Sequence, residues 1–113
     1  MAVRPVPRIC KQRSAELQRR VDRLKADAQS TLKAGATRTE VAGFFASESI
    51  PLKYESIGGQ TYAAGQVFVA GLPECATIAC GDDSALIGVR VEVDSGGAVV
   101  SDPVVVGMYT DCL

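Results

Sequence analysis

The chain has no histidine and no tryptophan among its 113 residues. Without histidine, the Ser/His/Asp and Cys/His nucleophile systems cannot form, and a common zinc ligand is missing. No segment approaches the roughly 20 consecutive apolar residues that a transmembrane helix needs. Only three Phe and three Tyr are present, so the core must consist mainly of aliphatic side chains. These absences favour a soluble domain that is not an enzyme.

Four cysteines are present, and an even number in a short chain favours two disulfides in an oxidising compartment. Three pairings are open. We favour Cys75–Cys80 with Cys10–Cys112, because the first closes a local loop and the second ties the N-terminal arm to the last strand. Zinc is disfavoured, since the spacing from Cys75 to Cys80 exceeds the usual knuckle and the other two cysteines come singly.

The length predicts one domain, 1–113, whose N-terminal part is helical. Residues 1–13, which include Pro5 and Pro7, are predicted to form an extended arm. Two helices are predicted within 14–50. The first carries an apolar stripe at helical spacing, formed by Leu17, Val21, Leu24, Ala28 and Leu32, and stops at Gly35. The second opens with a capping box formed by Thr37 and Glu40.

From residue 52 to 110 the apolar period changes to two, which predicts an antiparallel sheet. Turns are expected at Gly58-Gly59 and Gly96-Gly97, and a bend or bulge at Gly65. The predicted fold is therefore α+β, with two N-terminal helices packed on one face of a four-stranded antiparallel meander sheet, stapled by disulfides.

The face of this sheet opposite the helices is the candidate binding surface. We expect one set of side chains to face the helices, namely Ile87, Val89, Val91, Val93, Val104, Val106 and Met108. The opposite face then displays Arg90, Glu92, Val105 and Tyr109. Tyr and Arg are residue types that anchor protein interfaces. The alternative is that the tyrosine only packs against a neighbouring strand.

Other chemistry finds little support in the sequence. Asp82 and Asp83 are adjacent, but the spacing of a calcium-binding EF-hand loop is absent, and turn formation is favoured for them. No glycine-rich loop follows a strand and opens a helix, so no phosphate-binding loop and no cofactor are expected. A hydrolase or isomerase that uses carboxylates is the least supported alternative, because nothing singles out a pair of acids.

Charge is unevenly distributed along the chain. Residues 1–33 carry a net charge of +6 and residues 34–113 carry −7. We favour mutual neutralisation of a basic helix and an acidic sheet over an electrostatic footprint for a partner. Nucleic-acid binding is not expected, because the sheet is acidic and no aromatic residue interleaves the basic helix.

The segment Gly35-Ala36-Thr37-Arg38-Thr39-Glu40-Val41 and the strand–turn–strand that contains Val93-Asp94-Ser95-Gly96-Gly97 resemble parts of small bacterial envelope domains. These domains are the SmpA/OmlA-type outer-membrane lipoproteins and the repeat unit of β-lactamase inhibitory protein. The resemblance implies two helices packed on an antiparallel sheet and an address in the bacterial envelope. The paired repeats of the inhibitor and a lipobox are absent from this sequence.

Two functions are expected from these observations. The first is a small extracytoplasmic binding protein, of the inhibitor or immunity type, that acts by contact with another protein. The alternative is a structural, lipoprotein-like component of an envelope assembly, anchored through a lipidated leader upstream of residue 1. We expect a periplasmic or extracellular location with the leader removed, and the alternative is a cytoplasmic protein with reduced thiols.

Overall fold

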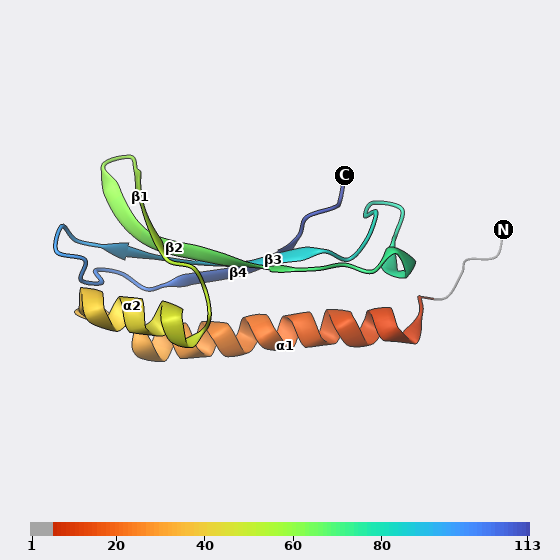
Figure 1. The fold of residues 1–113 in the computed structure, drawn as a ribbon, viewed down its shortest axis with the longest axis horizontal. Coiled ribbons are helices and arrows are strands. Elements are labelled where there is room, and N and C mark those ends of the chain that lie inside the picture. The colour runs from red at the N-terminus through yellow and green to blue at the C-terminus, as the bar shows by residue number, and fades with distance from the viewer. Residues whose placement is uncertain (1–5) are drawn as a thin grey trace.

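A computed structural model describes residues 6–113 and shows two layers, a sheet above two helices (Figure 1). The elements run in the order α1 (Arg8–Thr31), α2 (Arg38–Ser47), β1 (Lys53–Ile57), β2 (Gln60–Val69), the short 3-10 helix η1 (Pro73–Cys75), β3 (Ala85–Val93) and β4 (Val104–Tyr109). The strands form an antiparallel meander in the order β1-β2-β3-β4. The predicted α+β fold is confirmed.

The molecule is long and thin, with extents of 59 × 26 × 19 Å. Its radius of gyration of 16.8 Å exceeds the roughly 13 Å expected for a compact domain of this length. The core lies between the helices and one face of the sheet, and its largest fully buried side chains include Phe45, Leu32 and Ile87. The other face of the sheet has no layer above it in the described part of the chain (Figure 1).

Helix α1 begins earlier than the sequence pattern predicts. Residues 8–13, expected to belong to an extended arm, form its first turns, and residues 1–5 of that arm lie outside the described residues. The carbonyl oxygen of Pro7 accepts hydrogen bonds from the backbone N–H groups of Cys10 and Lys11. A proline is compatible with a helix start because its fixed φ suits the first turn and no N–H is needed there. Cys10 thereby joins the buried side of the helix.

Helix α2 begins as the capping box predicts. The Thr37 hydroxyl accepts the N–H of Glu40, and the Glu40 carboxylate accepts the N–H of Thr37, each at 3.2 Å. Between the two helices, Gly35 has a φ of 92°, which favours glycine, and it donates its N–H to the carbonyl of Val99. This contact links the turn between the helices to the sheet side of the molecule.

Strand β2 continues through Gly65 without the expected bulge in its register with β3. Gly65 pairs with Val89, and the pairing is unbroken from residue 61 to residue 69. Glycine is needed at this position for another reason. A Cβ here would lie 2.6 Å from Cγ2 of Ile50 and would collide with the carbonyl oxygen of Pro51. The chain that enters β1 crosses β2 here, so the crossing requires a residue without a side chain.

The disulfides differ from the favoured pairing. Cys10 bonds Cys75, which joins the first turn of α1 to η1, and Cys80 bonds Cys112, which joins the loop before β3 to the C-terminal segment. The pairing of Cys75 with Cys80 and of Cys10 with Cys112 is therefore wrong. Local closure did not decide the pairing, because each loop cysteine faces a different element. The two disulfides indicate a non-cytoplasmic, oxidising compartment.

Candidate functional site: the open face of the sheet

The open face of the sheet, which is the face away from the helices, carries a group of exposed apolar side chains. Strand register places Leu86 between Phe68 on β2 and Met108 on β4, and it places Val106 and Val104 further along β4 on the same face. Phe68 is 62% exposed and Met108 is 57% exposed. We call these five residues, the exposed Phe68, Val104, Val106 and Met108 and the half-buried Leu86, the apolar patch. They come from three adjacent strands and form one continuous surface.

The prediction of which β4 side chains face the helices is wrong. Val105 pairs with the buried Val89 and is only 8% exposed, so it faces the helices and belongs to the core. Tyr109 pairs with Ala85 on that same face, and its hydroxyl lies 3.2 Å from the Ser14 hydroxyl of α1 in a hydrogen bond. Val104, Val106 and Met108 were expected to face the helices and instead lie on the open face.

Arg90 and Glu92 do lie on the open face, as expected, next to the apolar patch. The Arg90 guanidinium sits over the ring of Tyr62, 4.9 Å from its centre, which holds the cation flat against the sheet. Further along, Lys53 and Glu55 of β1 form an ion pair of 3.2 Å on the exposed edge. The open face therefore has an apolar half and a charged half of both signs.

Two raised segments flank the open face at its ends. In Figure 1 the β1–β2 hairpin rises from one end of the sheet, and the loop between β2 and β3 rises with the C-terminal segment at the other. Both rise on the side away from the helices. The Cys80–Cys112 disulfide and a backbone bond from Gly81 to the carbonyl of Asp111 hold the loop and the C-terminal segment together. The apolar patch lies on the half of the sheet nearer this cross-linked end.

A clamp formed by Arg13 and Asp83 anchors the same loop to α1. Arg13 Nε donates to Asp83 Oδ2 at 2.7 Å, and Arg13 Nη2 donates to the carbonyl of Ala70 at 2.7 Å. The N–H of Leu72 donates to Asp83 Oδ1. The hydrogen bond from Arg13 is the main reason that the pKa of the Asp83 carboxyl is lowered, with the Leu72 N–H and the charge of Arg13 acting in the same direction and burial opposing them.

We expect Asp83→Asn to lower the free energy of unfolding by about 1 kcal/mol at pH 7, because it weakens a charge-assisted pair whose two side chains are only partly exposed to solvent. A lowered carboxyl pKa stabilises the fold above the ordinary aspartate pKa, and that stabilisation is lost as the pH falls through the folded-state value. The difference between wild type and Asp83→Asn should therefore shrink below about pH 4. Urea unfolding followed by circular dichroism at pH 7 and pH 3 measures both quantities.

Wild type must be compared with the variant because Glu48 changes the free energy of unfolding with pH in the opposite direction to Asp83. Burial, with a smaller effect of nearby Asp27, raises the pKa of the Glu48 carboxyl, which favours the folded state as the pH falls. Wild type and Asp83→Asn share this contribution, so their difference isolates the clamp. A difference that stays constant between pH 7 and pH 3 would contradict the role given to Asp83.

The two adjacent acids of the loop do form turn contacts. Asp82 Oδ1 accepts the N–H of Ser84 at 2.8 Å, and Asp83 forms the clamp. Within residues 6–113, no group of three or more Cys, Asp or Glu side chains is arranged to hold a metal ion. In the same part of the chain, no helix combines the length and apolarity that crossing a bilayer requires.

Searches of family models, of curated proteins and of solved structures found no match to this chain. The resemblance to small envelope domains therefore stays a prediction. Sequence reasoning assigned Val104, Val106 and Met108 to the core and did not single out Phe68 or Leu86. The glycine at position 107 fits the observed orientation of β4, in which Val105 faces the helices. Gly107, in phase with Val105, faces α1, where a Cβ would lie 2.7 Å from Cγ2 of Val21.

Proposed function

We propose that this protein is a small extracytoplasmic binding protein that acts by contact of its open sheet face with another protein, as inhibitors and immunity-type proteins do. The observation that carries the proposal is the apolar patch. Single exposed apolar residues are ordinary on a protein surface, whereas a contiguous group on adjacent strands is typical of an interaction site. Phe and Met, two members of the patch, are enriched in interfaces.

The surroundings of the patch support the same proposal. Arg90, Glu92 and Tyr62 lie beside it on the same face and supply charges and a ring of the kind that give interfaces specificity. The cross-linked loop and the Arg13–Asp83 clamp fix the end of the sheet that carries Phe68, Leu86 and Met108. A surface that is held in place before binding loses less conformational entropy when the partner arrives.

The proposed location is the periplasm or the extracellular space, which agrees with the two disulfides. The proposal needs no cofactor and no covalent chemistry, and it assigns no catalytic role to any carboxylate. A structural component of an envelope assembly would use the same apolar patch. The inhibitor version adds one requirement, namely that the partner is an enzyme or toxin whose activity stops on binding.

Photocrosslinking from the patch tests the proposal. Benzoylphenylalanine replaces Phe68 in one variant and Ile78 in a matched control, because Ile78 is fully exposed and lies in the loop before β3, outside the strands that carry the apolar patch. Each purified variant is irradiated in an envelope extract, and crosslinked partners are identified by mass spectrometry. We expect a partner that crosslinks to position 68 and not to position 78.

The identified partner is then purified, and its affinity is measured with wild type, Phe68→Ser and Ile78→Ser. Loss of a central aromatic contact should weaken binding about 30-fold or more, whereas Ile78→Ser should have no effect. An assay of the partner's activity distinguishes an inhibitor from a scaffold. If position 68 captures nothing beyond position 78, or if Phe68→Ser binds as wild type does, the open face is not the binding surface.

A further inference from the structure

The outer edge of β4 is the least protected strand edge of the sheet. Among residues 6–113, β4 pairs only with β3, and its sequence, Val-Val-Val-Gly-Met-Tyr from residue 104 to residue 109, contains no charged residue. The opposite edge, β1, carries the charged pair Lys53 and Glu55. Charged side chains protect an edge from pairing with another chain, so β1 is protected in this way and β4 is not.

The backbone groups that face outward along β4 follow from the ladder. The N–H of Thr110 donates to the carbonyl of Ser84 at 3.0 Å. Hydrogen-bonded pairs recur every second residue in an antiparallel ladder, so Val104, Val106 and Met108 direct their backbone groups toward β3. The N–H and C=O groups of Val105, Gly107 and Tyr109 consequently point away from the sheet. They present three donors and three acceptors in the spacing of a strand.

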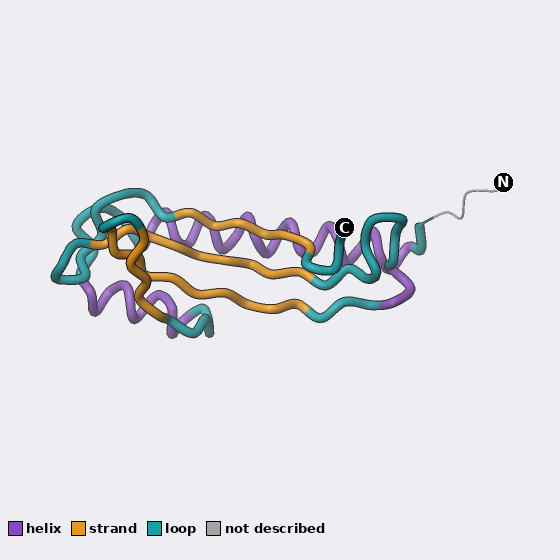
Figure 2. The backbone as a smooth tube through the Cα atoms, turned by 90° about the horizontal axis from the view of Figure 1, so that it is seen from above, coloured by secondary structure: helices purple, strands orange, loops and turns teal. Residues whose placement is uncertain are grey.

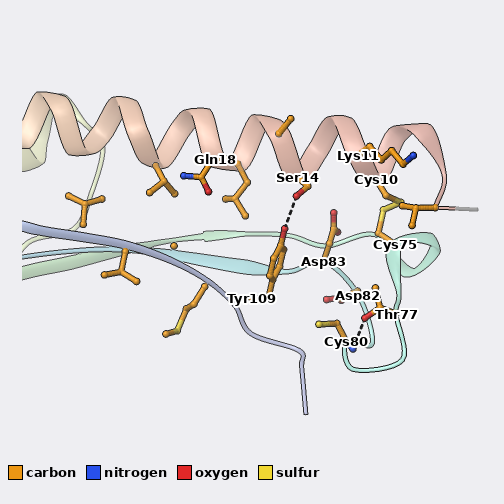
Figure 3. Close-up of a pocket in the computed structure, with 18 residues that line it drawn as sticks. Cys10, Lys11, Ser14, Gln18, Cys75, Thr77, Cys80, Asp82, Asp83 and Tyr109 are labelled. Atoms are coloured by element: carbon orange, nitrogen blue, oxygen red, sulfur yellow. Dashed lines mark hydrogen bonds between the residues drawn. A yellow bond between two sulfur atoms is a disulfide. The ribbon is translucent and has the colours of Figure 1, made fainter.

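A mostly apolar groove of about 950 Å³ runs beside this edge, between β4, α1 and the loop before β3 (Figure 3). Its wall on α1 includes Ala15, Leu17 and Val21, and the Cys10–Cys75 disulfide lies at its end. Seen from above, α1 runs beneath β4, which is the outermost strand on that side, and not beneath β2 or β3 (Figure 2). The side of the helix that lines the groove therefore forms a floor at this edge, which no strand covers in the described part of the chain.

We propose that the β4 edge and this groove bind an extended segment of a partner protein, which adds to the sheet as a fifth, antiparallel strand. Such binding uses main-chain hydrogen bonds for affinity and alternate side chains for specificity. Every second side chain of the segment would point down into the groove, where Ala15, Leu17 and Val21 favour apolar groups. The segment is thus one with small or branched apolar residues at alternate positions.

Charge at the loop end of the groove specifies the segment further. Asp82 lines the groove and Asp111 follows the end of β4, and neither carboxylate has a cationic partner within residues 6–113. In an antiparallel addition, the N-terminal end of the incoming segment lies at the C-terminal end of β4. Lysine or arginine at the N-terminal flank of the segment would therefore meet these two acids.

A second copy of this chain fits the edge less well. Pairing two β4 strands about a two-fold axis places them about 4.8 Å apart. Each α1 runs beneath its own β4 (Figure 2), so the two helices would lie about as close together as the two paired strands. Packed helices need 8–10 Å between their axes, which this arrangement does not provide. An extended segment that brings no helix of its own avoids the conflict.

This inference rests on the proposed function in that it names the binding element of a protein partner. Phe68 and Val104, which belong to the apolar patch, do not line the groove, and Ala15 lines the groove but does not belong to the patch. Failure of one surface is therefore distinguishable from failure of the other, because their variants are different.

Amide hydrogen exchange on the whole, disulfide-bonded protein tests the inference. In the free protein, the amides of Val106 and Met108 should exchange slowly, and those of Val105, Gly107 and Tyr109 should exchange fast. The probe is the peptide acetyl-Lys-Lys-Val-Thr-Val-Thr-Val-Gly-amide, at about 1 mM because a short strand binds weakly. We expect it to slow the three edge amides about tenfold or more while Val106 and Met108 change little.

Two matched controls accompany the probe. The same peptide with N-methyl groups on its three valines or, in a second version, on its two threonines loses the donors on one edge or the other, and one of the two versions should fail to protect the edge amides. Ala15→Arg fills the groove and should abolish protection, whereas Ala26→Arg, also on an exposed position of α1 but outside the groove, should leave it intact.

Three results would overturn the inference. The edge amides could already exchange slowly in the monomer, which would mean that the edge is covered. The probe could leave them fast, or protect them equally in Ala15→Arg. Protection that rises with protein concentration in the absence of the peptide, together with a dimer in sedimentation, would show that a second copy is the occupant instead.

Discussion

Replacing Cys10 and Cys75 together by alanine is expected to lower the free energy of unfolding by about 4 kcal/mol. The bridge joins residues 65 apart in the sequence, and closing a loop of this length restricts the unfolded chain strongly. For a domain of this size such a loss corresponds to a fall in Tm of about 20 °C. The Cys80–Cys112 bridge, with a separation of 32, should contribute slightly less. Thermal and urea unfolding of both double variants measures the two effects.

A tryptic digest without reduction checks the pairing itself. Cleavage after Lys and Arg leaves Cys10 in residues 9–11, Cys75 and Cys80 together in 54–90, and Cys112 in 91–113. The observed pairing links all three peptides into one species. A digest in which residues 54–90 separate from the other two peptides would contradict it. Thermolysin, which cleaves before Ile78, then separates Cys75 from Cys80 and identifies each partner.

Gly65→Ala is expected to lower the free energy of unfolding by about 3 kcal/mol, although it adds one methyl group. The added Cβ would meet the backbone of Pro51 and the side chain of Ile50, where the chain crosses β2 on its way into β1. Backbone atoms cannot turn aside as a flexible side chain can, so β1 or the crossing must shift. The measurement is urea unfolding at pH 7, with the slope checked for a change in the folded state.

Gly88→Ala is the matched control for this prediction. Gly88 also lies in the middle of a strand, but nothing lies within 4 Å of the position that a Cβ would take. An alanine there should be neutral or should raise stability by up to about 1 kcal/mol, because glycine is unfavourable inside a strand. If the two variants have the same stability, close approach at Gly65 is not what requires glycine.

Strands β3 and β4 show how far the sequence predicts which face of a strand is buried. In β3, apolar residues alternate strictly with Gly88, Arg90 and Glu92, so only one face can be buried, and the structure confirms it. In β4, Val104, Val105 and Val106 are equally apolar, and a period of two has no unique phase there. The register with β3, which sets Val105 opposite Val89, decides which of them faces the helices.

The start of α1 and the disulfide pairing both depend on a tertiary contact that the sequence pattern does not show. Apolar periodicity begins at Leu17, so the sequence gives no reason to extend the helix back to Arg8. In the structure, Cys10 is buried against η1 and bonded to Cys75, and this tertiary contact extends the buried stripe of the helix by two turns. Cysteine spacing shows that two bridges are feasible, but the partner of each cysteine depends on which elements meet.

Local spacing and composition are enough to predict the order of elements, the capping box of α2, the antiparallel meander and the presence of two disulfides. The fold was needed to show which face of β4 is buried, which cysteines join, why residue 65 is a glycine, and where an apolar patch and an unpaired edge lie. Those features depend on contacts between residues far apart in the chain, and local patterns carry no information on which of several equivalent contacts will form.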